Sequence, residues 1–214
     1  MGAPIFILCL TGALITIFDY LRSPEHPIYV EAMRFVVTIH RWFFLPNRLW
    51  GSYLTGIASF LFIVVNVTGI LLCLPKRKKN FKRLFIFRLR KGFTLYNLHR
   101  IAGVYVSLWL ILLSATGMAY AFPTIAEQVA GVLQVEHVPE SVRFQQMPQE
   151  DGTIKEVDLD EMMTPHQKMM VWVSILHTGK WGNGVGEIIN VLAVLEGCVL
   201  VVTGYILYFK RKRK

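Results

Sequence analysis

The sequence predicts an all-α membrane protein, a four-transmembrane-helix bundle that carries a small external β-hairpin. Three observations lead to this fold class. Hydrophobic residues make up 54% of the 214 positions and charged residues only 17%, whereas soluble domains average about 25% charged residues. The apolar residues are gathered into long runs, and the basic residues are concentrated at the ends of those runs. We therefore expect the chain to be embedded in a lipid bilayer.

The apolar runs define the helices of a single domain, residues 1–214. A helix needs roughly 20 predominantly apolar residues to cross the bilayer. Three runs reach that length, while the first, residues 3–18, is 16 residues long. We expect spans at about residues 3–20, 49–74, 98–122 and 185–209.

The net charge of +9 comes mainly from basic residues beside these spans. Residues 76–91 contain nine Lys or Arg and residues 210–214 contain five, together 14 of the 23 in the chain. Because short basic loops stay in the cytoplasm, we expect the loop 75–97 and the C-terminus to be cytoplasmic. Membrane topology explains this charge better than nucleic-acid binding does, so we expect lipid and no nucleic acid as a partner.

The long segment after the third span has the opposite charge. Residues 123–168 contain nine Asp or Glu and three Lys or Arg. We expect the loops 21–39 and 123–170 to lie outside, on the periplasmic side. Alternating stretches flank Asp151-Gly152, and this pattern predicts a small β-hairpin.

Each span contains a Thr-Gly pair, and we interpret the pairs as helix-packing elements. Small residues let membrane helices approach closely, and threonine bonds within its own helix. The pairs used here, one from each span, are Thr11-Gly12, Thr68-Gly69, Thr116-Gly117 and Thr203-Gly204. They also give a common reference for depth in the membrane.

Measured against these pairs, two histidines fall at a similar depth. His40 lies 28 residues before Thr68, and His177 lies 26 residues before Thr203. Both following helices run inward, so we expect the two imidazoles near the outer face. His99 begins a helix that runs outward, and we expect it near the cytoplasmic face.

Two imidazoles at one depth admit three interpretations. They are interfacial residues, ligands of a divalent metal, or axial ligands of a haem. A divalent metal needs three or four ligands, and no acidic residue lies close to His40 or His177 in the sequence. A haem needs a ligand on each side and cations for its propionates. Arg41, Arg48 and Lys180 are suitable cations, so the residues favour a haem and leave the interfacial interpretation open.

Four stretches resemble the PepSY-associated transmembrane family of bacterial inner-membrane proteins, which includes haem-containing ferric-siderophore reductases. They are LTGALITIFDYL, IHRW with GSYLTGIASFLFIVVNVTGILLCLPKR, LHRIAGVYVSLWLILLSATGM and LHTGKWGNGVGEIINVLAVLEGCVLVVTGYILYFKRK. The resemblance covers nearly all four spans in order, and the last stretch is its most specific part.

This resemblance implies haem b, one or two per chain, in the bacterial inner membrane. His40 and His177 match the outer ligand pair, and His99 matches a ligand of an inner haem. Arg41, Arg100 and Lys180 join them as cofactor-binding residues.

The resemblance also implies an oxidoreductase that moves electrons across the membrane. The donor is cytoplasmic or a quinol, and the leading acceptor is a periplasmic ferric siderophore. One alternative is a non-enzymatic membrane anchor or assembly subunit, with a transporter as a candidate partner. The other is a quinol-linked b-type cytochrome with a different acceptor.

Two features depart from the family pattern. Family members often carry sizeable PepSY-type external domains, whereas this chain has the short acidic segment 123–168. They also begin the first span with a further LHRW-like histidine, which here would fall before Met1. We expect an upstream extension to supply this partner of His99.

Glu196 is an acidic residue inside the fourth span. It is a candidate for proton uptake or haem tuning, or a neutral carboxyl bonded to a neighbouring helix.

Overall fold

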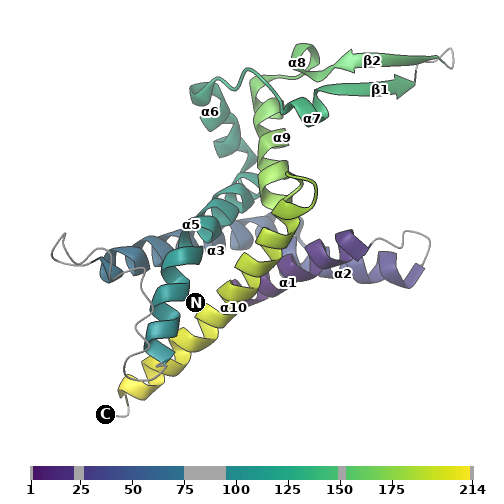
Figure 1. Cartoon of the computed structure of the whole chain (residues 1–214). Coiled ribbons are helices and arrows are strands. Elements are labelled where there is room, and N and C mark those ends of the chain that lie inside the picture. The colour runs from purple at the N-terminus through teal and green to yellow at the C-terminus, as the bar shows by residue number, and fades with distance from the viewer. Residues whose placement is uncertain (1, 22–26, 75–94, 149–152, 213–214) are drawn as a thin grey trace.

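The computed structural model describes residues 2–21, 27–74, 95–148 and 153–212 (Figure 1). Four of its helices are long and apolar enough to span a membrane, and two short strands pair antiparallel, so the predicted fold class is confirmed. The elements are α1 (Gly2–Leu21), α2 (Pro27–Trp42), α3 (Arg48–Cys73), α5 (Leu95–Ala121), α6 (Pro123–Leu133), α7 (Glu140–Arg143), β1 (Phe144–Pro148), β2 (Ile154–Asp158), α8 (Leu159–Met162), α9 (Pro165–Thr178) and α10 (Val185–Lys212).

The four spanning helices α1, α3, α5 and α10 alternate in direction. Helix α3 packs against α5, α5 against α10, and α10 against α1. The Gly2 amide donates to the Tyr205 hydroxyl at 3.2 Å, and Asp19 pairs with Lys180, so α1 and α10 are antiparallel. Phe122 contacts Gly56 near the start of α3, which makes α3 and α5 antiparallel too.

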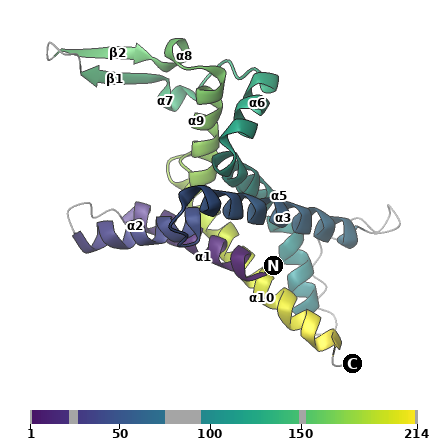
Figure 2. The same cartoon turned by 180° about the vertical axis from the view of Figure 1, so that it is seen from behind.

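The bundle therefore has two distinct ends. Both views show the β-hairpin at one end and the C-terminus at the other (Figures 1 and 2). We call them the hairpin end, where α1 and α5 finish, and the tail end, where α3 and α10 finish. The basic residues 210–212 lie at the tail end, in agreement with the alternation predicted from charge.

Small and polar residues form the helix contacts, and large apolar residues face outward. Helix α3 buries Gly51 and Gly56 together with Ala58, Ser59 and Asn66, while Leu72 is 87% exposed. This is the reverse of a soluble helix. It suits a hydrocarbon environment, in which close backbone approach rather than apolar burial holds helices together.

The segment between the first two spans contains helix α2, where the sequence suggested only a loop. A sharp corner separates α2 from α3, because Phe43 and Phe44 adopt positive φ of 48° and 61°. The Asn47 side chain then accepts the amides of Leu49 and Trp50 and starts α3. A Cβ on Gly51 would lie 2.6 Å from the Trp42 Cα, so glycine allows the two helices to cross.

A second corner separates α9 from α10. Helix α9 ends at Gly179, whose φ of 78° is left-handed. A Cβ there would lie 2.7 Å from the Gly186 carbonyl carbon, so the chain folds tightly back on itself. Each corner leaves a histidine, His40 or His177, in the last turn of the preceding helix.

Residues 123–148 and 153–178 form a unit that we call the hairpin subdomain. Strand β1 pairs with β2, with Phe144 opposite Asp158, so the predicted hairpin is confirmed; its Asp151-Gly152 turn lies outside the described residues. Helices α6 and α9 enclose a small core of Ala126, Ala130, Met169 and Val173.

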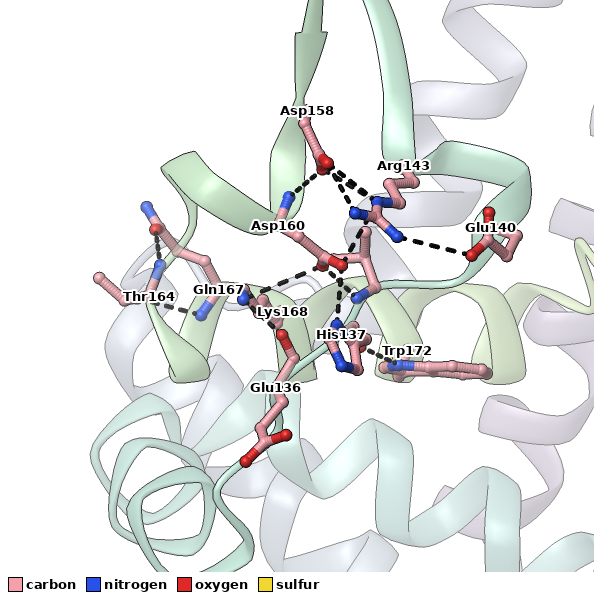
Figure 3. Close-up of polar contacts among 11 residues, drawn as sticks. Glu136, His137, Glu140, Arg143, Asp158, Asp160, Thr164, Gln167, Lys168 and Trp172 are labelled. Atoms are coloured by element: carbon pink, nitrogen blue, oxygen red, sulfur yellow. Dashed lines mark hydrogen bonds and ion pairs between the residues drawn. The ribbon is translucent and has the colours of Figure 1, made fainter.

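Carboxylates fasten the hairpin to α9 and its neighbours (Figure 3). The Arg143 guanidinium donates to Asp158 at 2.8 Å, and this bond holds the pKa of Asp158 below its ordinary value. Asp160 accepts the Val138 amide at 2.7 Å, which is the main cause of its own lowered pKa.

Helix α9 is tied to the same unit by two further bonds. The buried Lys168 ammonium donates to the Glu136 carbonyl, and the Trp172 indole donates to the His137 carbonyl at 2.9 Å. Figure 3 shows both bonds beside the Asp160 carboxylate. The helix that carries His177 is thus anchored to the hairpin subdomain.

Candidate functional site

A cavity of about 380 Å³ lies between the spanning helices. All four spans contribute to its wall, as do α2 and α9, and His40 and His177 both line it. The other residues are mainly apolar or small, among them Ile5, Leu110, Leu113 and Val194. Cofactor and small-molecule sites of this kind measure about 300–1,000 Å³.

The structure brings the two sequence-predicted imidazoles together. The ring centroids of His40 and His177 are 6.2 Å apart, and the ring planes are inclined by 50°. Because the corners after α2 and α9 stop these helices at the cavity, each histidine reaches it from a short helix rather than from a span.

Each of the three predicted histidines contacts a Thr-Gly pair on a neighbouring span. The Nδ1 atoms of His40, His177 and His99 lie 2.9, 2.9 and 2.7 Å from a threonine Oγ1. A Cβ placed on the adjoining glycine would lie only 3.3–3.4 Å from the imidazole Cε1. The pairings are His40 with Thr11-Gly12, His177 with Thr116-Gly117 and His99 with Thr203-Gly204. Helix packing alone is therefore an incomplete account of the pairs, because three of the four also hold a histidine.

The threonines determine which ring nitrogen is free. Thr11 Oγ1 lies 2.7 Å from the Ile7 carbonyl oxygen, and two oxygens that close need a hydrogen between them. The single hydroxyl proton is thus used within the helix, and the hydroxyl accepts a proton from His40 Nδ1. We assign the same Nδ1–H form to His177 and His99, whose threonines bond their own helices likewise. This leaves Nε2 unprotonated and able to bind a metal.

These residues fit a haem iron held from both sides. Two metal–imidazole bonds of about 2 Å, plus the distance from each nitrogen to its ring centre, add to about 6 Å, close to the 6.2 Å separation. Within the described residues, no group of three or more His, Cys, Asp and Glu could hold a metal ion. A haem needs only two axial protein ligands in an apolar slot.

Two of the predicted cations, Arg41 and Lys180, are placed differently. Arg41 lines the cavity, and its guanidinium lies 5.5 Å from the Trp42 ring centre. Lys180 instead pairs with Asp19 at 3.0 Å, and Asp19 itself lines the cavity. Asp19 was not anticipated from the sequence, although a lone acid at the end of an apolar run was a usable signal. Arg41 therefore remains available for an anionic group, while Lys180 already has a partner.

Asn190 is a further residue whose role the sequence did not reveal. It is 3% exposed, and its amide donates to the His177 carbonyl at 3.1 Å. Its oxygen accepts the Trp109 indole proton at 2.7 Å. Asn190 thus joins the end of α9 to α10 and α5, and fixes the backbone of His177.

The tail end contains His99 and a different set of neighbours. The Nε atom of Arg100 is buried and has no hydrogen-bond partner among the described residues. The fourth Thr-Gly pair shows no contact within 4 Å of a Cβ placed on Gly69. Glu196 is half-buried and forms no hydrogen bond or ion pair within the described part of the chain.

Comparison with known families gives one match. A family model described as the PepSY-associated TM region matches residues 21–211. No curated protein matches the chain. The matched region includes the two corners, the three histidines and three of the four Thr-Gly pairs.

Proposed function

The chain belongs to the PepSY-associated TM family, and we propose that it is a b-type haem protein that carries electrons across the membrane. In this proposal the membrane is the bacterial inner membrane, with the basic segments in the cytoplasm. The donor is a cytoplasmic or quinol reductant at the tail end. The acceptor is ferric siderophore iron at the hairpin end.

The facing imidazoles of His40 and His177 are the observation that carries this proposal. Both rings line one cavity, and the Nδ1 atom of each lies 2.9 Å from a threonine hydroxyl, which supports an unprotonated Nε2 on each ring. Interfacial histidines would instead turn their polar edges toward headgroups. Arg41, on the cavity wall, is suited to bind a propionate.

The residues perform three tasks in this mechanism. His40 and His177 would hold the haem iron, Asn190 fixes the backbone of His177, and the apolar wall would exclude water. A haem with two imidazole ligands supplies one-electron transfer and has no open position for bond chemistry. His99 is the corresponding ligand at the tail end, about 27 Å along α5 from the glycine beside His177.

Ferric iron suits the hairpin end as an acceptor. One electron converts Fe(III) to Fe(II), and the product is bound weakly by a chelator built for Fe(III). The acidic segment 123–168 favours a cationic or neutral chelate over an anionic one.

A redox spectrum of the purified chain tests this function. We expect a b-type reduced-minus-oxidised spectrum with one or two haems per chain. Adding a cationic ferric chelate to the reduced protein should reoxidise it, and an Fe(II) indicator should report the released iron. The gallium(III) form of the same chelator is the matched control, because it has the same charge and shape but is not reduced.

The outcomes separate the alternatives. Absence of haem contradicts both redox functions and favours an anchor or assembly subunit. Haem that the ferric chelate does not reoxidise rules out this acceptor and leaves a quinol-linked cytochrome.

A further inference from the structure

We propose that Thr11, Thr116 and Thr203 are positioning residues that fix the tautomer and the ring orientation of the three histidines. The threonine is the acceptor for imidazole Nδ1–H, and the adjoining glycine leaves room for the ring edge. The inference goes beyond the proposed function, because it assigns a role to residues that touch no cofactor. Only the predicted effect on haem binding rests on the proposed function.

The three contacts share one geometry, which argues against chance proximity. In each, Oγ1 lies 2.7–2.9 Å from imidazole Nδ1, and the same hydroxyl lies 2.7–3.0 Å from the carbonyl four residues earlier in its helix. The three threonines are 5–6% exposed. The threonine hydroxyl and the imidazole Nδ1 are therefore both satisfied in a single arrangement.

Other threonines of the spans show that the imidazole contact is selective. Thr16, five residues after Thr11 in the same helix, lines the same cavity and donates to the Gly12 carbonyl at 3.1 Å. Thr68 has the same bonds to its own helix as Thr11. No histidine contact is recorded for either within the described residues. Intrahelical bonding alone thus does not explain the three contacts.

The arrangement should affect iron binding through the ring. A partner for the second nitrogen fixes the ring plane and raises the basicity of the coordinating nitrogen, and losing such a partner typically lowers metal affinity about 10–100-fold. Without the hydroxyl, the Nδ1 proton has no acceptor in the apolar wall. The imidazole would then lose its preference for the Nδ1–H form.

The test uses Thr11→Val, which removes the hydroxyl at nearly constant shape, and Thr11→Ser, which keeps it. In haem-free full-length protein, ¹⁵N NMR should show His40 as the Nδ1–H form in the wild type and in Thr11→Ser. Thr11→Val should lose that preference. With haem added, Thr11→Val should bind haem about tenfold more weakly, and its midpoint potential should rise because the less basic His40 imidazole donates less electron density to the iron. Thr116→Val should have the same effects through His177.

Thr68→Val is the matched control, because Thr68 bonds its own helix as Thr11 does and is not among the cavity-lining residues. It should leave both the tautomer and the haem affinity unchanged. An unchanged His40 tautomer in Thr11→Val overturns the inference, and so does an equal loss of haem affinity in Thr68→Val. A protein that binds no haem would refute the proposed function, while the NMR measurement would still decide the role of the threonines.

Discussion

The hairpin end and the tail end of the bundle hold imidazoles by the same contact but build different sites. At the hairpin end, His40 and His177 face each other across a cavity. At the tail end, His99 alone contacts a Thr-Gly pair among the described residues, on α10. The contact to each ring is therefore common to both ends, and the pairing of rings is not.

The difference lies in how the chain arrives at each end. His40 and His177 occupy the last turns of α2 and α9, where a sharp corner follows. His99 instead belongs to the first turns of the continuous helix α5. Two converging corners bring two histidines to one cavity, whereas one continuous helix supplies a single ring.

Removing one ligand of the facing pair should give the largest effect. We expect His177→Ala to abolish the low-spin signal of the hairpin-end haem, because one imidazole cannot hold both axial positions. His99→Ala should leave that signal intact. Electron paramagnetic resonance of the ferric protein measures both. His137→Ala, in the hairpin subdomain, is the control, and full retention of the signal in His177→Ala would show that the two ends do not differ as described.

The next effect should come from Asn190, which supports only the hairpin end. Asn190→Leu leaves the Trp109 indole proton without its acceptor, at a cost of about 1–3 kcal/mol in the free energy of unfolding. Asn66→Leu is the control, because among the described residues the Asn66 amide bonds only the Phe62 carbonyl of its own helix. Chemical denaturation in detergent measures both variants. An equal loss of unfolding free energy in the two variants would argue against a special role for the Asn190 hydrogen bonds.

Lowering the pH should destabilise the hairpin subdomain before it affects the tail end. The pKa values of Asp158 and Asp160 are lowered from the ordinary value of 3.8, so the unfolded subdomain takes up protons before the folded one. Their stabilisation is complete above that pH and is lost as the pH falls through the lowered values. Hydrogen exchange of the β1 and β2 amides between pH 7 and 3 measures this loss. Asp158→Asn should flatten the dependence, and an unchanged profile would exclude the carboxylates as its cause.

The smallest effect should come from Lys180. Its side chain is 52% exposed and pairs with Asp19, and such surface pairs contribute about 0–1 kcal/mol. Lys180→Met should therefore change stability and haem affinity little, while Arg41→Met should weaken haem binding more. Haem titration of the two variants compares them. A larger loss in Lys180→Met would show that this lysine, as first expected from the sequence, is the main propionate partner.

The sequence was sufficient to predict the spans, their alternation and the hairpin. Apolar length and basic flanks act locally, and Asp-Gly between alternating stretches is a local signal. The meeting of His40 with His177 could also be anticipated, because similar spacings from Thr68 and Thr203 place residues of parallel helices at a similar depth. None of these inferences required knowledge of which helices are neighbours.

The remaining features depend on tertiary contacts. Thr11 holds a histidine of α2 only because α2 folds back against α1, and no sequence spacing specifies that contact. Lys180 follows His177 closely in the chain, yet the corner at Gly179 turns it toward Asp19. Helix α2 was overlooked because its residues are less apolar than those of a span.

The threonine that bonds its own helix has a consequence for protein design. Its hydroxyl proton is satisfied locally, so mounting an imidazole on a neighbouring helix demands no additional polar residue from the lipid-facing surface. A designer could transfer the three-residue unit of threonine, glycine and a facing histidine between membrane bundles. The polar atoms of threonine and histidine would bond within the unit, so the receiving helices could remain wholly apolar elsewhere.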